Sequence, residues 1–282
     1  MNSAAKKGRN VKNRIDEKFR ELKAKKRGGF IPFIVAGDPD LETTKALILE
    51  LARQGASIIE LGVPFSDPVA DGVTIQAAAE RALLNLISVG DILRIVAEVR
   101  AEKCETPVIL FSYFNPILQF GLERFADEAV SSGVDGILVT DLVPEEAREF
   151  RAILTAKNLS LIMLAAPTSS DERLKKICEK ASGFVYAVSR AGVTGARNET
   201  SSDAKTLVER LRKFADLPIA VGFGISTAAQ IAETWKYADA AVVGSAIVAE
   251  IGCLGDSTNL VEVVSEFVKN LLPKESVSDD LP

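Results

Sequence analysis

The chain has 282 residues, 47% of them hydrophobic, which suffices for one large buried core or two small ones. Its 34 basic and 39 acidic residues give a net charge of −5, and the acidic residues are spread through helical stretches, which argues against nucleic acid or an anionic membrane as partner. It contains no histidine, so proton transfer must use other side chains.

The three cysteines lie far apart, without a CxxC pair, which argues against a disulfide framework and a zinc site and favours a reducing cytoplasm. No apolar run reaches the roughly 20 residues that span a bilayer, so we expect a soluble protein. Residues 1–12 are basic and lack the apolar segment of a secretory signal. A solvated extension is the favoured interpretation of this segment, and an organellar transit peptide is the alternative.

Short apolar segments alternate with amphipathic stretches of helical length, which predicts repeated βαβ units. The expected strands are 30–36, 57–62, 107–113, 135–140, 159–165, 183–189, 218–223 and 239–244. Expected helices include 41–55, 122–133, 144–158 and 203–216. A further helical pattern at 14–26 precedes the first strand and could close the N-terminal end of a barrel.

Eight evenly repeated strand–helix units predict an α/β protein with a single-domain (β/α)₈ TIM barrel and an extra N-terminal helix. We expect the barrel to span 13–272, between a flexible extension at 1–12 and a flexible tail at 273–282. A doubly wound open sheet is the alternative architecture. The closed barrel is favoured because unusual residues follow the strands, where barrels place their active sites.

Glu60 is an acidic residue near the end of the second strand, on the same face as Ile58. If both side chains point inward, a carboxylate enters the barrel mouth. Burying it unpaired would cost several kcal/mol or raise its pKa, so a functional role is favoured over a structural ion pair with Arg or Lys.

Asp71 ends the loop PFSDPVADG, which follows the same strand. It could cap the helix expected near Val73, shape the Asp-Gly turn, or share acid–base and electrostatic work with Glu60. Asp67 is either an Asx-turn residue or a contact with a partner. Asp141 is a candidate helix cap, and Tyr186 is either ordinary core or part of the site.

Small-residue turns follow the last two strands, at Gly222–Ser226 and Gly244–Ala246. Glycines let a phosphate approach the backbone, and free N–H groups at a helix N-terminus attract it, so these turns predict a phosphate site. The long segment 189–203 after strand six reads as a mobile lid. Its glycines could act as hinges or could only shape turns. Thr194 could hydrogen-bond a catalytic group when the loop closes.

The segments ELGVPFSDPVADGVTIQ, SRAGVTGARN, GFGIS and GSAIV, in this order, resemble the signature segments of tryptophan synthase alpha subunits. The resemblance extends from residue 32 to 248. It implies a carbon–carbon lyase that cleaves indole-3-glycerol phosphate into indole and glyceraldehyde 3-phosphate. By this resemblance Glu60 shuttles the protons, Asp71 stabilises charge on the indole ring, and Tyr186 positions Glu60 or the substrate.

The same resemblance implies further contacts. Phe33 and Phe111 would flank the indole, and Thr194 would orient Asp71. The residues that would hold the phosphate are Gly195, Gly224, Gly244 and Ser245. The chain departs from the family at Val73, where proline is usual, and this affects loop rigidity more than chemistry.

The resemblance also implies a beta subunit, in an alpha2beta2 heterotetramer, that carries pyridoxal phosphate and consumes the indole. No cofactor is expected in this chain. Pro64, Asp67 and Asn115 would lie on loops that face the beta subunit. Asp67 could then relay the state of the beta subunit to Asp71 and the lid.

Two absences fit chemistry without a cofactor or metal. No expected strand contains the lysine that a Schiff-base aldolase needs, and no histidine is available as a metal ligand. Three rivals stay open: another phosphate-binding barrel enzyme, a non-catalytic barrel that activates the beta chain, and a stand-alone lyase of the same family.

Overall fold

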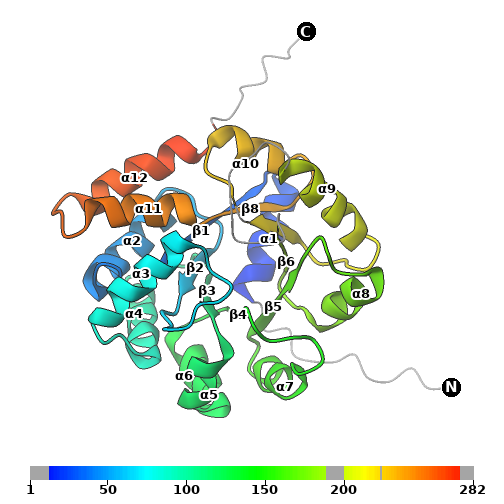
Figure 1. Cartoon of the computed structure of the whole chain (residues 1–282), viewed down its shortest axis with the longest axis horizontal. Helices are drawn as coiled ribbons and strands as arrows, with labels where there is room; N and C mark the ends of the chain where they lie inside the picture. The colour runs from blue at the N-terminus through cyan, green and yellow to red at the C-terminus, as the bar shows by residue number, and fades with distance from the viewer. Residues whose placement is uncertain (1–12, 189–199, 223, 274–282) are drawn as a thin grey trace, which may run out of the picture.

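Eight parallel strands form a closed barrel in sequence order, in a computed structural model that describes residues 13–188, 200–222 and 224–273 (Figure 1). All eight predicted strands are confirmed, and because β1 pairs with both β2 and β8, the open-sheet alternative is wrong. The strands are β1 (Gly29–Val35), β2 (Ile59–Gly62), β3 (Val108–Ser112), β4 (Gly136–Val139), β5 (Ser160–Ala165), β6 (Val185–Val188), β7 (Ile219–Gly222) and β8 (Ala240–Val243).

Helices surround this barrel, and the expected N-terminal helix is present as α1 (Arg14–Ala24). The helix expected from residue 144 begins later, at Arg148, because residues 143–147 form hydrogen-bonded turns. The other helices are α2 (Leu41–Arg53), α3 (Val73–Leu84), α4 (Val89–Ala101), α5 (Phe114–Phe120), α6 (Leu122–Ser132), α7 (Arg148–Ala156), α8 (Asp171–Lys180), α9 (Thr200–Leu211), α10 (Ala228–Thr234), α11 (Ser245–Leu254) and α12 (Leu260–Leu271).

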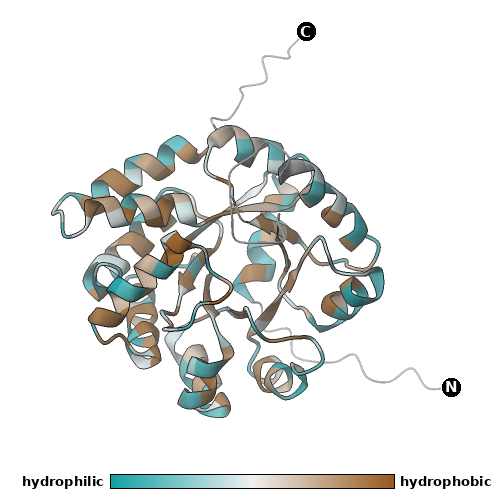
Figure 2. Ribbon diagram, in the orientation of Figure 1, coloured by the Kyte–Doolittle hydropathy of each residue, from teal (hydrophilic) through white to brown (hydrophobic). Residues whose placement is uncertain are grey.

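Strand alternation divides the buried side chains into two apolar clusters. On β2 and the residue before it, Ile58 belongs to the cluster inside the barrel, whereas Ile59 and Leu61 belong to the cluster between strands and helices. The helices show hydrophobic faces toward the barrel and hydrophilic faces outward (Figure 2). Glu60 therefore shares the inward face with Ile58, as predicted.

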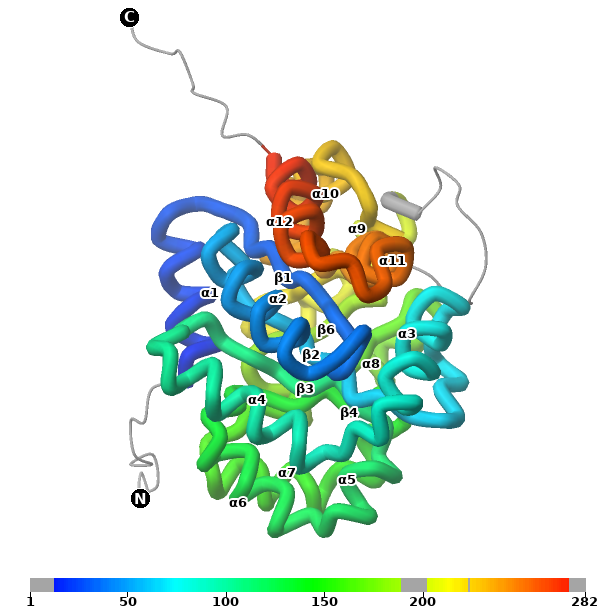
Figure 3. Tube along the Cα trace, turned by 90° about the vertical axis from the view of Figure 1, so that its left-hand side faces the viewer, coloured from blue at the N-terminus to red at the C-terminus, as the bar shows by residue number. Residues whose placement is uncertain are grey.

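Helix α1 covers the N-terminal end of the barrel (Figure 3). Its Ile15 and Phe19 are buried in the inner cluster, and the Phe19 and Phe184 rings lie 5.6 Å apart. Buried Asp135 accepts hydrogen bonds from Arg14 and Arg100 at 3.0 and 2.8 Å, which fixes the start of α1. With this end covered, the carboxyl ends of the strands are the accessible end of the barrel.

The described residues contain no helix long and apolar enough to cross a membrane. Cys104, Cys178 and Cys253 are free thiols. The expected flexible extension, 1–12, lies outside the described residues, as does all but residue 273 of the expected tail.

Leu86, directly after the C-cap of α3, has a left-handed backbone with φ of 54° and a side chain that is 87% exposed. A leucine there is strained and gains little from burial. We expect Leu86→Gly to stabilise the fold by about 1 kcal/mol and raise Tm by about 2–4 °C in thermal unfolding.

Leu84→Gly is the matched control, because Leu84 is equally exposed but lies within the helix. It should destabilise by up to about 1 kcal/mol. If both substitutions change the free energy of unfolding equally, the backbone of Leu86 is not strained.

Candidate active site

Glu60 lies inside the barrel mouth, in register with Phe33 on β1 and Ile109 on β3. Its side chain is 1% exposed, and its Oε1 atom has no hydrogen-bond partner among the described residues. No ion pair with Glu60 occurs in the described part of the chain, so the predicted structural alternative is not found there. Burial alone raises the pKa of Glu60 to about 8, which keeps the carboxyl protonated near neutral pH.

Asp71 lies in the loop between β2 and α3, and its Oδ2 accepts a hydrogen bond from the Tyr113 hydroxyl at 3.1 Å. The helix-cap alternative is wrong, because Gly72 is the N-cap of α3 and no side chain caps this helix. Burial raises the pKa of Asp71 to about 6, while the bond from Tyr113 opposes this rise. The helix begins at Val73.

Tyr186 belongs to the inner cluster and is 3% exposed. Its pKa is raised by burial and, further, by the nearby negative charges of Glu60 and Asp71. The hydroxyl occupies the space beside Gly222, where an added Cβ would lie 2.0 Å from the oxygen. Glycine at the end of β7 thus gives this phenol its room near both carboxyl groups.

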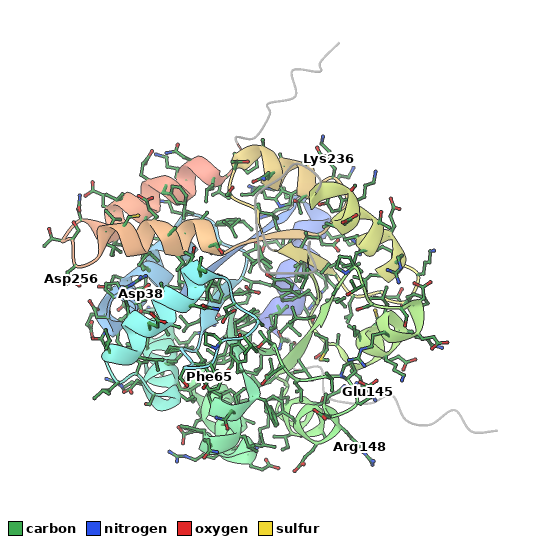
Figure 4. All side chains as sticks on the ribbon, viewed as in Figure 1. Asp38, Phe65, Glu145, Arg148, Lys236 and Asp256 are labelled. Carbon is green, nitrogen blue, oxygen red and sulfur yellow. The ribbon has the colours of Figure 1, made fainter. Side chains whose placement is uncertain are left out.

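An apolar pocket opens beside Asp71. Phe33 and Phe111 form one wall, with ring centroids 5.2 Å apart and planes at 77°. Phe65, in the loop after β2, also lines the pocket and lies toward the side of α5 and α6 (Figure 4). The pocket is lined by Phe33, Val35, Gly62, Val63, Pro64, Phe65, Asp71, Ile75, Ala79, Phe111 and Tyr113.

Apart from the polar groups of Asp71 and Tyr113, the side chains of this lining are apolar. The aromatic rings supply apolar contact area, and the carboxylate of Asp71 supplies one hydrogen-bond acceptor. Pro64 is buried in this lining, whereas Asp67 and Asn115 are exposed on loops at the same end of the barrel.

The two glycine turns differ in their hydrogen bonds. Before α10, the Gln230 side chain accepts from the N–H groups of Ser226 and Thr227, as part of a capping box. The N-terminus of α11, at Gly244 and Ser245, has no side-chain cap and no acidic residue in its first turn. Its N–H groups make α11 the better of the two helix starts for an anion.

The remaining predicted site residues are placed as follows. Gly224 is exposed at the end of β7, with a left-handed φ of 78°. Thr194 and Gly195, like most of the expected lid, lie outside the described residues. Asp141, which follows β4, caps α5, the helix that follows the neighbouring strand β3. Its Oδ1 accepts a hydrogen bond from the N–H of Phe114, the first residue of α5, at 2.8 Å.

Sequence reasoning missed two groups at this end of the barrel. Tyr113 follows β3 directly, and its position at a strand end was the available signal. Arg81 on α3 forms a bidentate ion pair with buried Asp38. The Nε and Nη2 atoms of Arg81 each donate to one carboxylate oxygen of Asp38 at 2.8 Å. This pair fixes α3, the helix that starts beside Asp71, to the loop after β1.

Residues 19–274 match the family model described as tryptophan synthase alpha chain. The tryptophan synthase alpha chain of Geotalea daltonii is 50% identical over 235 residues, covering 83% of this chain and 89% of that protein. The alpha chain of Xanthomonas euvesicatoria is 49% identical over 259 residues, covering 92% and 97%. The chain belongs to the tryptophan synthase alpha-chain family.

Solved structures agree with this membership. The alpha subunit from Legionella pneumophila superposes with a TM-score of 0.85 at 36% identity, covering 93% of this chain and 97% of that one. A chain of the tryptophan synthase complex from Pyrococcus furiosus gives 0.79 at 40% identity, covering 86% and 97%. The protein is thus a lyase of tryptophan biosynthesis, as the sequence predicted, and the rival barrel enzymes are excluded.

The raised pKa of Glu60 makes the stability of this alpha chain depend on pH. The unfolded carboxyl has a pKa of about 4.3, so the stability gained from the neutral buried form is full below that pH and is lost as pH rises through about 8. Between pH 6 and pH 9 we expect the wild type to lose about 2–3 kcal/mol more than Glu60→Gln, which stays neutral. Urea unfolding at both pH values measures this difference.

Glu145→Gln is the control, since Glu145 is exposed on the outer side near α7 (Figure 4). Its pH dependence should follow that of the wild type. Parallel curves for wild type and Glu60→Gln would contradict the burial of an ionisable, unpaired carboxyl.

Proposed function

We propose that Glu60 is the proton-transfer group of a retro-aldol cleavage of indole-3-glycerol phosphate. The observation that carries this proposal is a fully buried carboxyl group at the barrel mouth whose Oε1 has no hydrogen-bond partner within residues 13–188, 200–222 and 224–273. A pKa of about 8 lets it start protonated and still ionise within the reaction.

The proposed reaction needs two proton movements. The Glu60 carboxyl delivers its proton to indole C3, and the resulting carboxylate removes the proton of the glycerol hydroxyl next to the bond that breaks. The electron pair of the O–H bond then forms the aldehyde of glyceraldehyde 3-phosphate, and the pair of the carbon–carbon bond returns to the indole ring. The Glu60 carboxyl group is therefore protonated at the end of the cycle, as it was at the start.

Asp71 is the proposed partner of the indole N–H. When C3 is protonated, positive charge develops on the ring, and a carboxylate near the nitrogen stabilises it. A pKa of about 6 leaves Asp71 ionised at neutral pH, while Glu60 is protonated there. Two carboxyl groups with pKa values on opposite sides of 7 support this division of roles.

The remaining assignments concern binding. Phe33 and Phe111 would flank the indole, and Tyr186 would position Glu60 or the substrate. Thr194, outside the described residues, would orient Asp71. The uncapped start of α11 supports a phosphate held by Gly244 and Ser245, together with Gly224 and Gly195.

A beta subunit is the proposed partner, in an alpha2beta2 heterotetramer that contains pyridoxal phosphate in the beta chain. The similarity to a chain of the Pyrococcus furiosus tryptophan synthase complex supports it. Pro64, Asp67 and Asn115 would lie on loops that face that subunit. Asp67 and Asn115 are exposed there, whereas Pro64 is buried in the pocket wall. We expect the complex in the cytoplasm, with flexible ends at 1–12 and 273–282.

Glu60→Gln tests the catalytic assignment. We expect near-complete loss of indole release with retained substrate binding, because the amide nearly matches the carboxyl in size but cannot shuttle protons. The measurements are indole formation from indole-3-glycerol phosphate and substrate affinity by calorimetry.

The wild-type chain is assayed with and without a beta subunit in the same experiment. Indole release by the chain alone at the full rate would favour a stand-alone lyase. Absence of indole in both cases would favour a barrel that only activates the beta chain, and wild-type rates in Glu60→Gln would exclude the shuttle.

Asp67→Ala tests the proposed relay to the beta subunit. Because Asp67 is exposed and bonds only within its loop in the described contacts, to Ser66 at 2.8 Å, slow basal cleavage should persist while activation by the beta subunit weakens. Asp256→Ala is the control, since Asp256 lies at the outer tip between α11 and α12 (Figure 4). If the beta subunit activates Asp67→Ala as strongly as the wild type, the proposed relay through Asp67 is wrong.

A further inference from the structure

The hydroxyl of Tyr113 lies where three parts of the barrel mouth meet. The residue follows β3 and is 3% exposed. Its oxygen accepts from the N–H of Ala70 at 2.9 Å, and its proton is donated to Asp71 Oδ2 at 3.1 Å. The side chain of Thr140, at the end of β4, is a further hydrogen-bond partner. One phenol therefore joins the β2–α3 loop to the ends of β3 and β4.

The direction of these bonds follows from their chemistry. A backbone N–H can only donate, so Ala70 uses a lone pair of the Tyr113 oxygen and leaves the hydroxyl proton for another acceptor. An ionised carboxylate can only accept, and it makes the stronger bond with such a donor. The arrangement thus favours the ionised form of Asp71 over the protonated one.

The ring of Tyr113 is also in contact with neighbouring side chains. It packs against Phe65 with centroids 5.1 Å apart and planes at 33°, and it lines the same pocket as Phe33 and Phe111. A fixed ring gives the hydroxyl a fixed position, so the carboxylate it holds is fixed relative to the aromatic wall.

We propose that Tyr113 is the positioning residue for Asp71: its hydroxyl aims the carboxylate at the indole pocket and keeps it ionised when substrate binds. This inference rests on the role proposed above for Asp71. Tyr113 acts through that carboxylate and takes no part in the proton shuttle of Glu60.

The titratable groups described on the other strands do not stabilise the Asp71 carboxylate in place of the Tyr113 hydrogen bond. Glu60 on β2 is protonated near neutral pH, and Tyr186 on β6 stays neutral because burial and both carboxyl groups raise its pKa. No ion pair with Asp71 occurs among the described residues. The Tyr113 bond is the interaction that lowers the pKa of Asp71 against the effect of burial.

Tyr113→Phe removes the hydroxyl and keeps the ring on Phe65. We expect kcat/KM for indole release to fall about tenfold to hundredfold at neutral pH, mainly through kcat. The acid limb of the pH profile should move to higher pH, because Asp71 loses the bond that favours its ionised form. Both are measured on the full chain with indole-3-glycerol phosphate.

Tyr237→Phe is the matched control, since it makes the same chemical change in a partly buried tyrosine after α10. Its rate and pH profile should equal those of the wild type. Asp71→Asn and the double variant Asp71→Asn/Tyr113→Phe complete a cycle: if Tyr113 acts through Asp71, removing its hydroxyl has little further effect on indole release.

Thr140→Val covers the case in which Tyr113→Phe fails to fold. It leaves the phenol in place but removes a neighbour that polarises it, so the acid limb should move in the same direction by less. An unshifted acid limb in the folded variants, or an equal loss from Tyr113→Phe in the Asp71→Asn background, overturns the inference. Full activity of Asp71→Asn alone would instead refute the role proposed for Asp71.

Discussion

The burial of Glu60, with no compensating charge from the residues that the structure describes, is the constraint on which the site depends. A carboxyl group at 1% exposure, inside an apolar barrel, strongly prefers its neutral form. A lysine or arginine in contact would stabilise the carboxylate and remove the proton that the proposed reaction uses at its start. The neighbouring strands instead supply aromatic and aliphatic side chains, in register at Phe33 and Ile109.

A second carboxyl group, Asp71, lies on the same side of the barrel but in a different environment. It is less buried and is bonded by a phenol, so its pKa rises only to about 6. The difference between the two groups comes from solvent access and one hydrogen bond, since both begin as ordinary acids. This is how a protein without histidine can hold a neutral acid and an anion at the same end of one barrel at the same pH.

The strands and the inward direction of Glu60 could be predicted because apolar runs and alternation are local properties of the chain. Contacts between neighbouring loops could not. Tyr113 and Asp71 are 42 residues apart, and Asp141 caps the helix after β3, not the one after its own strand. In a parallel barrel the nearest loop in space comes from another repeat unit, and no periodicity in the sequence reports such pairs.

Phe33 lies between two glycines, and this has a consequence for substrate choice. A Cβ on Gly62 would approach the ring to 2.7 Å, while Gly244 at the start of α11 lies against its other side. The same ring therefore forms the pocket wall and lies against the turn that is proposed to bind the phosphate. The span between the aromatic pocket and that turn is thereby set by a rigid spacer, which would discriminate among ligands by the length of the chain joining their two ends.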